Sequence, residues 1–375
     1  MFVSSGTPVP VYNLYRTSDG ITNRGLALAT VVYLGVTALA LLLCGRLSNH
    51  LGRRPVAVAA VASSLTGCLV LTQVHTLPVL LSGRVLQGLA CGVASTALGS
   101  YVVDTAPPRP AWLPSMITSS VPQFAIPVGA LLSGALAQYL PAPRLLAYLV
   151  VATALAGCAL WLWWCPETVT RKPGAFASMR PRVHVPQGAG RLMAAAGAGV
   201  VATWSLGGFF QAFAPAITAD HLGTSNALVI AVVFASIMVL SPAGGSLSGR
   251  LHPATGLRAG LSVFTLATMV IVAALHAGSI TVFLGAAFVA GAAMGVAGTG
   301  GMRAVLGPAA RGDRAGVLAT IYLVSYSGAA VPGLIAGQLS GMVGLGVIAL
   351  CYAALVLLAS ITAAVLVRGG KSKGN

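Results

Sequence analysis

The chain has 375 residues, of which 57% are hydrophobic and only 7% charged, and its formal net charge is +16. Soluble globular domains carry about 25% charged residues, so this composition excludes an ordinary water-exposed surface and predicts a protein of the lipid bilayer. A strongly basic soluble protein would suggest a nucleic-acid partner, but none is expected here because the basic residues gather between apolar segments. The six cysteines lie within or at the ends of those segments without metal-ligand spacing, so no metal or cofactor is expected.

Residues 1–23 form the most unusual part of the chain. Residues 1–6 are a short apolar stretch, and residues 7–15 are rich in Pro, Val and Tyr. The segment lacks the basic start and the long apolar run of a signal peptide. The segment resembles the outer end of the first helix and the first external loop of major facilitator superfamily transporters, in which a Pro/Leu/Tyr-rich run follows that helix. The resemblance implies that the chain begins inside its first helix.

Long apolar segments then follow one another to the end of the chain. Segments of about 20 apolar residues favour membrane-spanning helices, because lipid offers the backbone no hydrogen-bond partners. The sequence therefore predicts an all-α integral membrane protein with eleven visible spans, at 25–44, 56–74, 78–101, 112–138, 143–165, 191–217, 225–248, 257–277, 280–303, 314–340 and 344–367.

The positive charges predict the orientation of these spans. Residues 45–55 form a short basic connection, and short loops that keep Arg and Lys stay on the cytoplasmic side. Only Arg16, Arg24 and Arg144 lie on the opposite side, and Arg84 lies within a span. The protein is thus predicted to be a multi-pass protein of the cytoplasmic membrane with a cytoplasmic C-terminus.

A break at 166–190 divides the chain. This stretch is basic and rich in Pro, which favours a cytoplasmic linker between an N-terminal bundle at 1–165 and a C-terminal bundle at 191–375. Residues 45–51 align with residues 245–251 at a constant offset, which indicates two parallel repeats. Gly291 and Gly295 lie at GxxxG spacing within a span and are predicted to pack helices closely.

The 45–55 stretch reads Gly-Arg-Leu-Ser-Asn-His-Leu-Gly-Arg-Arg-Pro. It resembles the loop between the second and third helices of major facilitator superfamily transporters, G-x-L-[AS]-D-x-x-G-R-[RK], through Gly45, Gly52, Arg53 and Arg54. The resemblance implies two pseudo-repeated bundles on a twelve-helix plan, with the first helix truncated here, and a loop that gates the cytoplasmic side. Asn49 departs from the pattern because it lacks the charge of the usual Asp. The acid of an ionic latch would then come from elsewhere, and the cytoplasmic candidates are Asp104 and Asp313.

Arg84, Gln87 and Gly88 resemble the R-x-x-[QG]-G pattern of the fourth superfamily helix. A charge within a span is by default a functional hypothesis. The alternative is that Arg84 snorkels to the nearby outer interface. None of the five acids lies mid-span, so a proton-coupling carboxylate either belongs to the missing first helix or is not used.

Residues 125–134 resemble in part the G-x-x-x-G-P-x-x-G-G pattern on the fifth helix of superfamily antiporters. Gly129 and Gly134 are kept, and Pro127 lies between the positions of the pattern, so the resemblance favours export over import. Polar and aromatic residues within spans are further candidates for lining a cavity, although each could instead serve helix packing; they are Tyr33, Gln123, Trp204, Gln211 and Tyr326.

These features predict a secondary transporter that moves a small organic solute by alternating access, with drug or metabolite efflux favoured. The alternatives are a sugar or metabolite importer of the same fold and a degenerate paralogue that transports nothing. A membrane-embedded enzyme is not predicted, because no paired carboxylates, HExxH or Ser/His/Asp set lies at membrane depth. The expected partners are a small-molecule substrate, the lipid bilayer and, as a candidate co-substrate, a proton; the protein is expected to be a monomer.

Overall fold

The computed structural model describes residues 1–107, 113–180, 190–307 and 314–368, and these residues form helices joined by turns, with no strand among them. The chain divides into two compact units, which are considered separately below. Unit 1 comprises Met1–Pro181 with Asn226–Ala231, and unit 2 comprises Arg182–Ser225 with Val232–Asn375.

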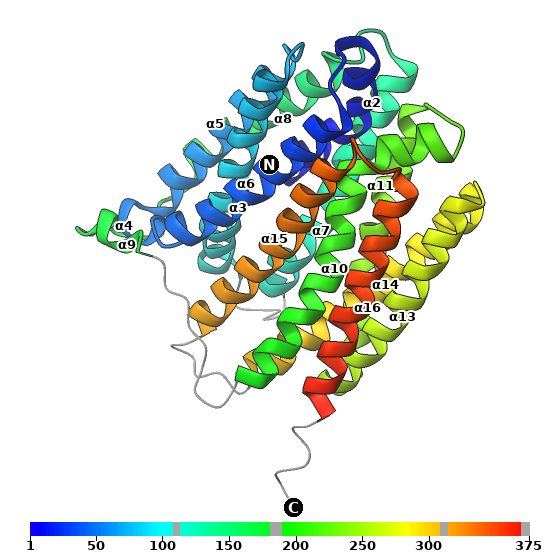
Figure 1. Cartoon of the computed structure of the whole chain (residues 1–375). Helices are drawn as coiled ribbons and strands as arrows, with labels where there is room; N and C mark the ends of the chain where they lie inside the picture. The colour runs from blue at the N-terminus through cyan, green and yellow to red at the C-terminus, as the bar shows by residue number, and fades with distance from the viewer. Residues whose placement is uncertain (108–112, 181–189, 308–313, 369–375) are drawn as a thin grey trace, which may run out of the picture. The chain divides into compact units, whose positions relative to one another are not determined.

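Unit 1 is a helical bundle. Its helices are α1 (Phe2–Gly6), α2 (Pro8–Asp19), α3 (Asn23–Cys44), α4 (Ser48–Leu51), α5 (Arg53–Leu71), α6 (Leu77–Thr105), α7 (Leu113–Tyr139), α8 (Leu146–Trp164) and α9 (Ala175–Ser178). Helix α6 packs against both α3 and α5, α5 also packs against α8, and α1 packs against α7 (Figure 1). The Thr22 side chain accepts a hydrogen bond from the Gly25 N–H and so caps the start of α3.

The N-terminal segment differs from the prediction. Residues 7–15 were expected to include an external loop, but helix continues through them to Asp19, and Thr7 between α1 and α2 also has right-handed helical angles. Pro8 and Pro10 lie in the first turn of α2, where backbone N–H groups have no partner within the helix, so these prolines cost the helix little. The turn after α2 is made by Gly20 at φ +66°.

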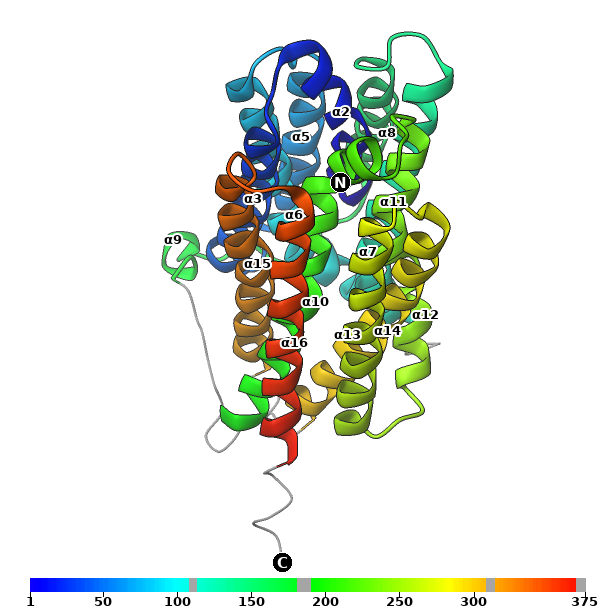
Figure 2. The same cartoon turned by 45° about the vertical axis from the view of Figure 1, so that its right-hand side comes forward.

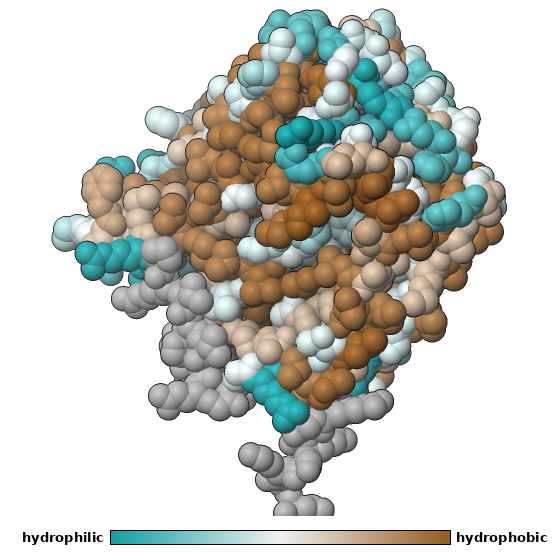
Figure 3. All heavy atoms as spheres, in the orientation of Figure 1, coloured by the Kyte–Doolittle hydropathy of each residue, from teal (hydrophilic) through white to brown (hydrophobic). Residues whose placement is uncertain are grey.

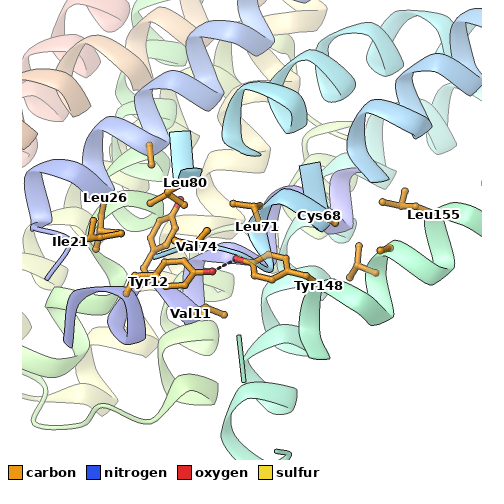
Figure 4. Packing of buried hydrophobic residues seen from close by; sticks show 14 of the residues in the cluster. Val11, Tyr12, Ile21, Leu26, Cys68, Leu71, Val74, Leu80, Tyr148 and Leu155 are labelled. Carbon is orange, nitrogen blue, oxygen red and sulfur yellow. Dashed lines mark hydrogen bonds between the residues drawn. The ribbon is translucent and has the colours of Figure 1, made fainter. Parts of the chain in front are cut away.

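The core of unit 1 shows why residues 7–15 are helical. Val11, Tyr12 and Tyr15 are buried among side chains of α5, α6 and α8. Figure 4 shows Tyr12 and Val11 beside Val74 and Tyr148, and its dashed line is the hydrogen bond of 2.9 Å between the Tyr15 and Tyr148 hydroxyl groups. A helix is needed here because a loop would leave buried backbone polar groups without partners.

Unit 2 is a second bundle. Its helices are α10 (Gly190–Ala216), a π-helical turn (Ile217–His221), α11 (Ala227–Val239, whose first residues group with unit 1), α12 (Ser241–Ser248), α13 (Pro253–His276), α14 (Ile280–Leu306), α15 (Arg314–Leu339) and α16 (Leu345–Arg368). Helix α10 packs against α15 and α16, and α14 packs against α12 and α13 (Figure 2). A Cβ on Gly291 would lie 2.8 Å from the Ile237 oxygen, and one on Gly295 would overlap the Ser241 oxygen, so the predicted packing role of these glycines is confirmed.

The predicted spans are confirmed as helices, with boundaries that differ from the prediction by four residues at most. Among the described residues, ten helical segments are long and apolar enough to cross a membrane. The eleventh predicted span is α7, a helix of 27 residues whose side chains are only partly described. Apolar side chains also face outward, as on α16, where Val347, Leu350 and Leu358 are about half exposed or more (Figure 3). Such a surface suits lipid rather than water.

Candidate functional site

The 45–54 loop of unit 1 turns sharply at Gly52. This glycine separates α4 from α5 and has φ +102° and ψ 149°, a conformation that is essentially restricted to glycine. A Cβ at this position would also lie 2.5 Å from the Oε2 atom of Glu167. The backbone conformation therefore favours glycine at residue 52, and a larger residue would also displace the Glu167 carboxylate.

Arg53 connects the loop to α6. Its Nε atom lies 3.0 Å from Asp104 Oδ2, and its Nη1 group donates to Ser48 Oγ and to the side-chain oxygen of Asn49. Asn49 thus keeps an acceptor for Arg53 although it supplies no charge. Of the two acids expected to replace that charge, Asp104 pairs with Arg53, and Asp313 lies outside the described residues.

Glu167 is the acid that sequence reasoning missed. Its carboxylate accepts hydrogen bonds from the backbone N–H groups of Arg53 at 2.8 Å and Arg54 at 3.1 Å, which are the first residues of α5. It also accepts from the N–H groups of Thr168 and Val169. Burial raises the pKa of Glu167, but these backbone N–H groups outweigh burial and hold the pKa below its usual range.

One signal in the sequence could have pointed to Glu167. Helix α5 starts Gly-Arg-Arg-Pro, so its own N-cap residue has no side chain to accept a hydrogen bond from the first turn. An acceptor for that turn has to come from another segment, and a carboxylate is favoured at a helix N-terminus. Besides Asp104 and Asp313, Glu167 is the remaining acid on the side of this loop.

Arg84 is fully buried within unit 1, which excludes the alternative that it snorkels to the interface. Its Nη1 group donates to the Ser5 oxygen at 3.0 Å and to Gln87 Oε1 at 2.8 Å. Gln87 in turn donates to the Ser4 oxygen, and the guanidinium carbon lies 4.2 Å from the centre of the Tyr33 ring. The Arg84 side chain therefore contacts the backbone of α1, Gln87 of its own sequence pattern and the predicted cavity residue Tyr33.

The arginine is only partly satisfied. Its Nε and Nη2 atoms have no hydrogen-bond partner among the described residues, and no carboxylate in the described part of the chain forms an ion pair with it. Buried charges are normally paired, because desolvating an isolated charge is costly. Within the described part of the chain, Arg84 thus has two donors without a partner and a positive charge inside a helical bundle.

The glycines of the predicted patterns lie at close helix crossings. A Cβ on Gly88 would lie 2.7 Å from the Tyr33 oxygen on α3, and one on Gly129 would overlap the Val3 oxygen on α1. A Cβ on Gly134 would lie 2.6 Å from the Cβ of Ala231 in the first turns of α11. Pro127 is buried on the same helix as Gly129. Gly45 follows the last residue of α3, where the chain turns toward α4.

The predicted cavity residues divide between the units. Tyr33 is buried against Arg84, and Gln123 is half-buried on α7 of unit 1. In unit 2 the rings of Trp204 and Tyr326 meet edge to face with centroids 4.9 Å apart, and Gln211 is buried on α10. Tyr33 therefore contacts Arg84 in unit 1, and Trp204 contacts Tyr326 in unit 2. Among the described residues no group of three or more His, Cys, Asp or Glu side chains could hold a metal ion.

A second ionic cluster of unit 1 was not predicted. Arg144 pairs with Asp19 at 2.8 Å, and the His75 Nδ1 atom lies 3.3 Å from the same carboxylate. The cluster joins the end of α2 to the α5–α6 and α7–α8 connections. Burial raises the pKa of Asp19, but the hydrogen bonds from Arg144 and His75 outweigh burial and lower it. These residues are far apart in the sequence, so no local pattern marks them.

Helices of membrane-spanning length in both units, with a fully buried arginine in one of them, are typical of a multi-pass helical membrane protein. The sequence profile described as Major Facilitator Superfamily matches residues 1–331, which is most of the chain. The chain therefore belongs to the Major Facilitator Superfamily.

Comparison with individual proteins agrees with this assignment. The chain is 34% identical to multidrug resistance protein MdtL of Klebsiella pneumoniae over 103 residues, which is 27% of this chain and 26% of that protein. The fold resembles the crystal structure of a variant of the nucleoside transporter NupG, with a TM-score of 0.72, 12% identity and coverage of 97% and 96% of the two chains. It also resembles the human organic anion transporter MFSD10, with a TM-score of 0.63, 16% identity and 96% coverage of both chains.

Proposed function

We propose that this protein is a secondary transporter that moves a small organic solute out of the cytoplasm across the cell membrane by alternating access. The observation that carries the proposal is Arg84, a fully buried cation in a helix of membrane-spanning length, two of whose donors have no partner among the residues that the structure describes. Burying an incompletely paired charge is costly, so a role in transport explains Arg84 better than helix packing alone does.

Arg84 also supports a proposal about the charge of the solute. Its free Nε and Nη2 groups favour a solute with hydrogen-bond acceptors, and its charge opposes the approach of a cation. The solute is therefore expected to be neutral or anionic. A proton remains the candidate co-substrate, although no described carboxylate pairs with Arg84.

Export is supported by two observations. Gly129 and Gly134 of the antiporter-like pattern both lie at close helix crossings, as that pattern implies. The partial match to MdtL, whose name describes multidrug resistance, points in the same direction. Under the same proposal, the 45–54 loop and the C-terminus lie on the cytoplasmic side of the membrane.

The test is accumulation of fluorescein, an anionic probe, and of ethidium, a cationic probe, in cells that express the protein or its Gly52→Leu variant. We expect expression of the wild-type protein to lower fluorescein accumulation and to leave ethidium unchanged. A rise in accumulation would indicate import instead of export. If purified protein in proteoliposomes moved neither probe under a proton gradient, the non-transporting paralogue would be the better description.

A further inference from the structure

An exposed aromatic cluster lies where α8 ends in unit 1. Trp161, Trp163 and Trp164 form the last turn of α8, and their side chains are 75%, 64% and 74% exposed. Helix α8 is apolar and long enough to span a membrane, so its last turn is expected at the boundary of the bilayer. Tryptophan is enriched at that boundary because its ring is apolar and its N–H is polar. The three indoles therefore indicate the level of the lipid headgroups.

Residues 166–180, called the strap below, stay at this level. Arg54 Nη1, at the start of α5, donates to the oxygens of Trp163 and Cys165, so α5 begins where α8 ends. The Lys172 N–H donates to a backbone oxygen of α4 at 2.9 Å, and α9 of the strap packs beside α4 (Figure 1). Because α4 joins the membrane-length helices α3 and α5, it lies at a membrane face, and the strap lies along the same face.

The strap exposes an apolar ring together with positive charges. Phe176 of α9 is 91% exposed, the highest value among the large hydrophobic side chains that the structure describes. Arg171, Lys172 and Arg180 are also exposed, and their side chains form no hydrogen bond or ion pair with a described residue. Apolar rings and cations that are exposed side by side suit a membrane surface, where the rings enter the acyl boundary and the cations meet the headgroups.

The acids on this face are already engaged. The Glu167 carboxylate is held by backbone N–H groups, and Asp104 pairs with Arg53. Arg46 and Arg54 donate to neutral backbone oxygens, which leave their charges uncompensated. In total the 45–54 loop and the strap carry six basic side chains against two carboxylates there and at the end of α6; the basic residues are Arg46, Arg53, Arg54, Arg171, Lys172 and Arg180. The face therefore attracts anions.

We propose that the last turn of α8 and the strap together bind the headgroups of anionic phospholipids. The headgroup phosphate lies against Arg171, Lys172 and Arg180, and the tryptophans and Phe176 contact the adjoining acyl chains. A free phosphate ion would meet the same cations but would leave these aromatic side chains exposed to water, so a lipid fits the whole surface better. The proposal requires that the chain spans a membrane and does not depend on which solute it moves or in which direction.

The test is quenching of tryptophan fluorescence in phosphatidylcholine vesicles that contain the whole chain and a small fraction of brominated lipid. Three of the five tryptophans of the chain belong to the proposed surface, so quenching reports which lipid lies beside it. Brominated phosphatidylglycerol, which is anionic, should quench more than brominated phosphatidylcholine at the same fraction. A basic side chain near an anionic lipid surface strengthens association about fivefold, so Arg171→Gln combined with Lys172→Gln should lower the binding of phosphatidylglycerol relative to phosphatidylcholine at least about fivefold.

Arg250→Gln is the matched control, because Arg250 is an exposed arginine in the connection between α12 and α13 of unit 2. It should keep the preference for phosphatidylglycerol. Phe176→Trp adds an indole to α9, and its added emission should be quenched by brominated lipid and only weakly by aqueous iodide. If the double variant does not insert into vesicles, Arg180→Gln is judged by the same measurement.

Four results would overturn the proposal. The first is equal quenching of the wild type by the two brominated lipids, and the second is a preference that the double variant retains or that Arg250→Gln loses equally. The third is strong quenching of the indole at residue 176 by iodide. The fourth is loss of the preference when inorganic phosphate replaces chloride at constant ionic strength, because the cations would then form a site for free phosphate.

Discussion

Replacing Gly52 with alanine tests two contributions to stability: the positive-φ backbone of the turn and the position of Glu167 beside it. The residue has φ +102° and ψ 149°, and forcing an L-residue into such a conformation costs about 1–3 kcal/mol. The new Cβ would lie 2.5 Å from Glu167 Oε2, so the carboxylate must also leave the start of α5. Because Glu167 is exposed, we discount this loss to roughly 1 kcal/mol, which gives a total of about 2–4 kcal/mol.

Gly20→Ala is the matched control, since Gly20 also has positive φ but nothing lies within 4 Å of its Cβ position. Its expected cost is the left-handed conformation alone, about 1–2 kcal/mol. The measurements are the thermal midpoint of each variant in detergent and its rate of cleavage by trypsin after Arg171. The Lys172 N–H beside this bond donates to the His50 oxygen of the loop, so cleavage reports release of this segment from the loop. Gly52→Ala should be less stable and more rapidly cleaved than Gly20→Ala. Equal midpoints and equal cleavage would refute the inference that Gly52 makes room for Glu167.

Three further predictions concern other contacts. Arg84→Met should leave the thermal midpoint unchanged or higher, because an incompletely paired buried charge is removed, while flux is lost; a large fall in the midpoint would contradict this reading. Gly129→Leu should prevent stable folding, because its side chain would overlap the α1 backbone, whereas Gly157→Leu, with nothing within 4 Å, should be tolerated, as measured by size-exclusion profiles. The lowered pKa of Asp19 adds stability above the ordinary value of 3.8, and this stability is lost as the pH falls through the lowered pKa. Arg144→Gln should therefore reduce the fall in thermal midpoint between neutral and strongly acidic pH; an unchanged fall would count against the Asp19 pair.

Much of the architecture could be predicted because it depends on local composition. A span requires only a sufficient run of apolar residues, since the bilayer satisfies no backbone group. Each predicted span is helical near its predicted boundaries, and the span at 225–248 is divided into α11 and α12. The exception is residues 7–15, where the resemblance implies an external loop and the structure has a helix. The prolines lie in the first turn of α2, and this helix buries Val11, Tyr12 and Tyr15 in one cluster with Tyr148. No local pattern reports that packing.

The candidate site also has a part that local patterns predict and a part that only the fold reveals. Short-range patterns identified Gly52, Arg53 and Arg84 because a tight turn and a charge within an apolar run are visible in a few residues. The acids that bind the loop lie far along the chain. Asp104 on α6 is one of the two candidates that the sequence indicates, whereas Glu167 after α8 is not among them.

The sequence by itself determined that this is a helical membrane protein with a basic loop and an intramembrane arginine, because hydropathy and charge act residue by residue. Only the tertiary structure decided that Arg84 is fully buried, with two donors that lack a partner in the described ranges, and that Glu167 caps α5. Burial and hydrogen bonding depend on which segments the fold brings within about 3 Å of each other, and the spacing of residues along the chain does not contain that information.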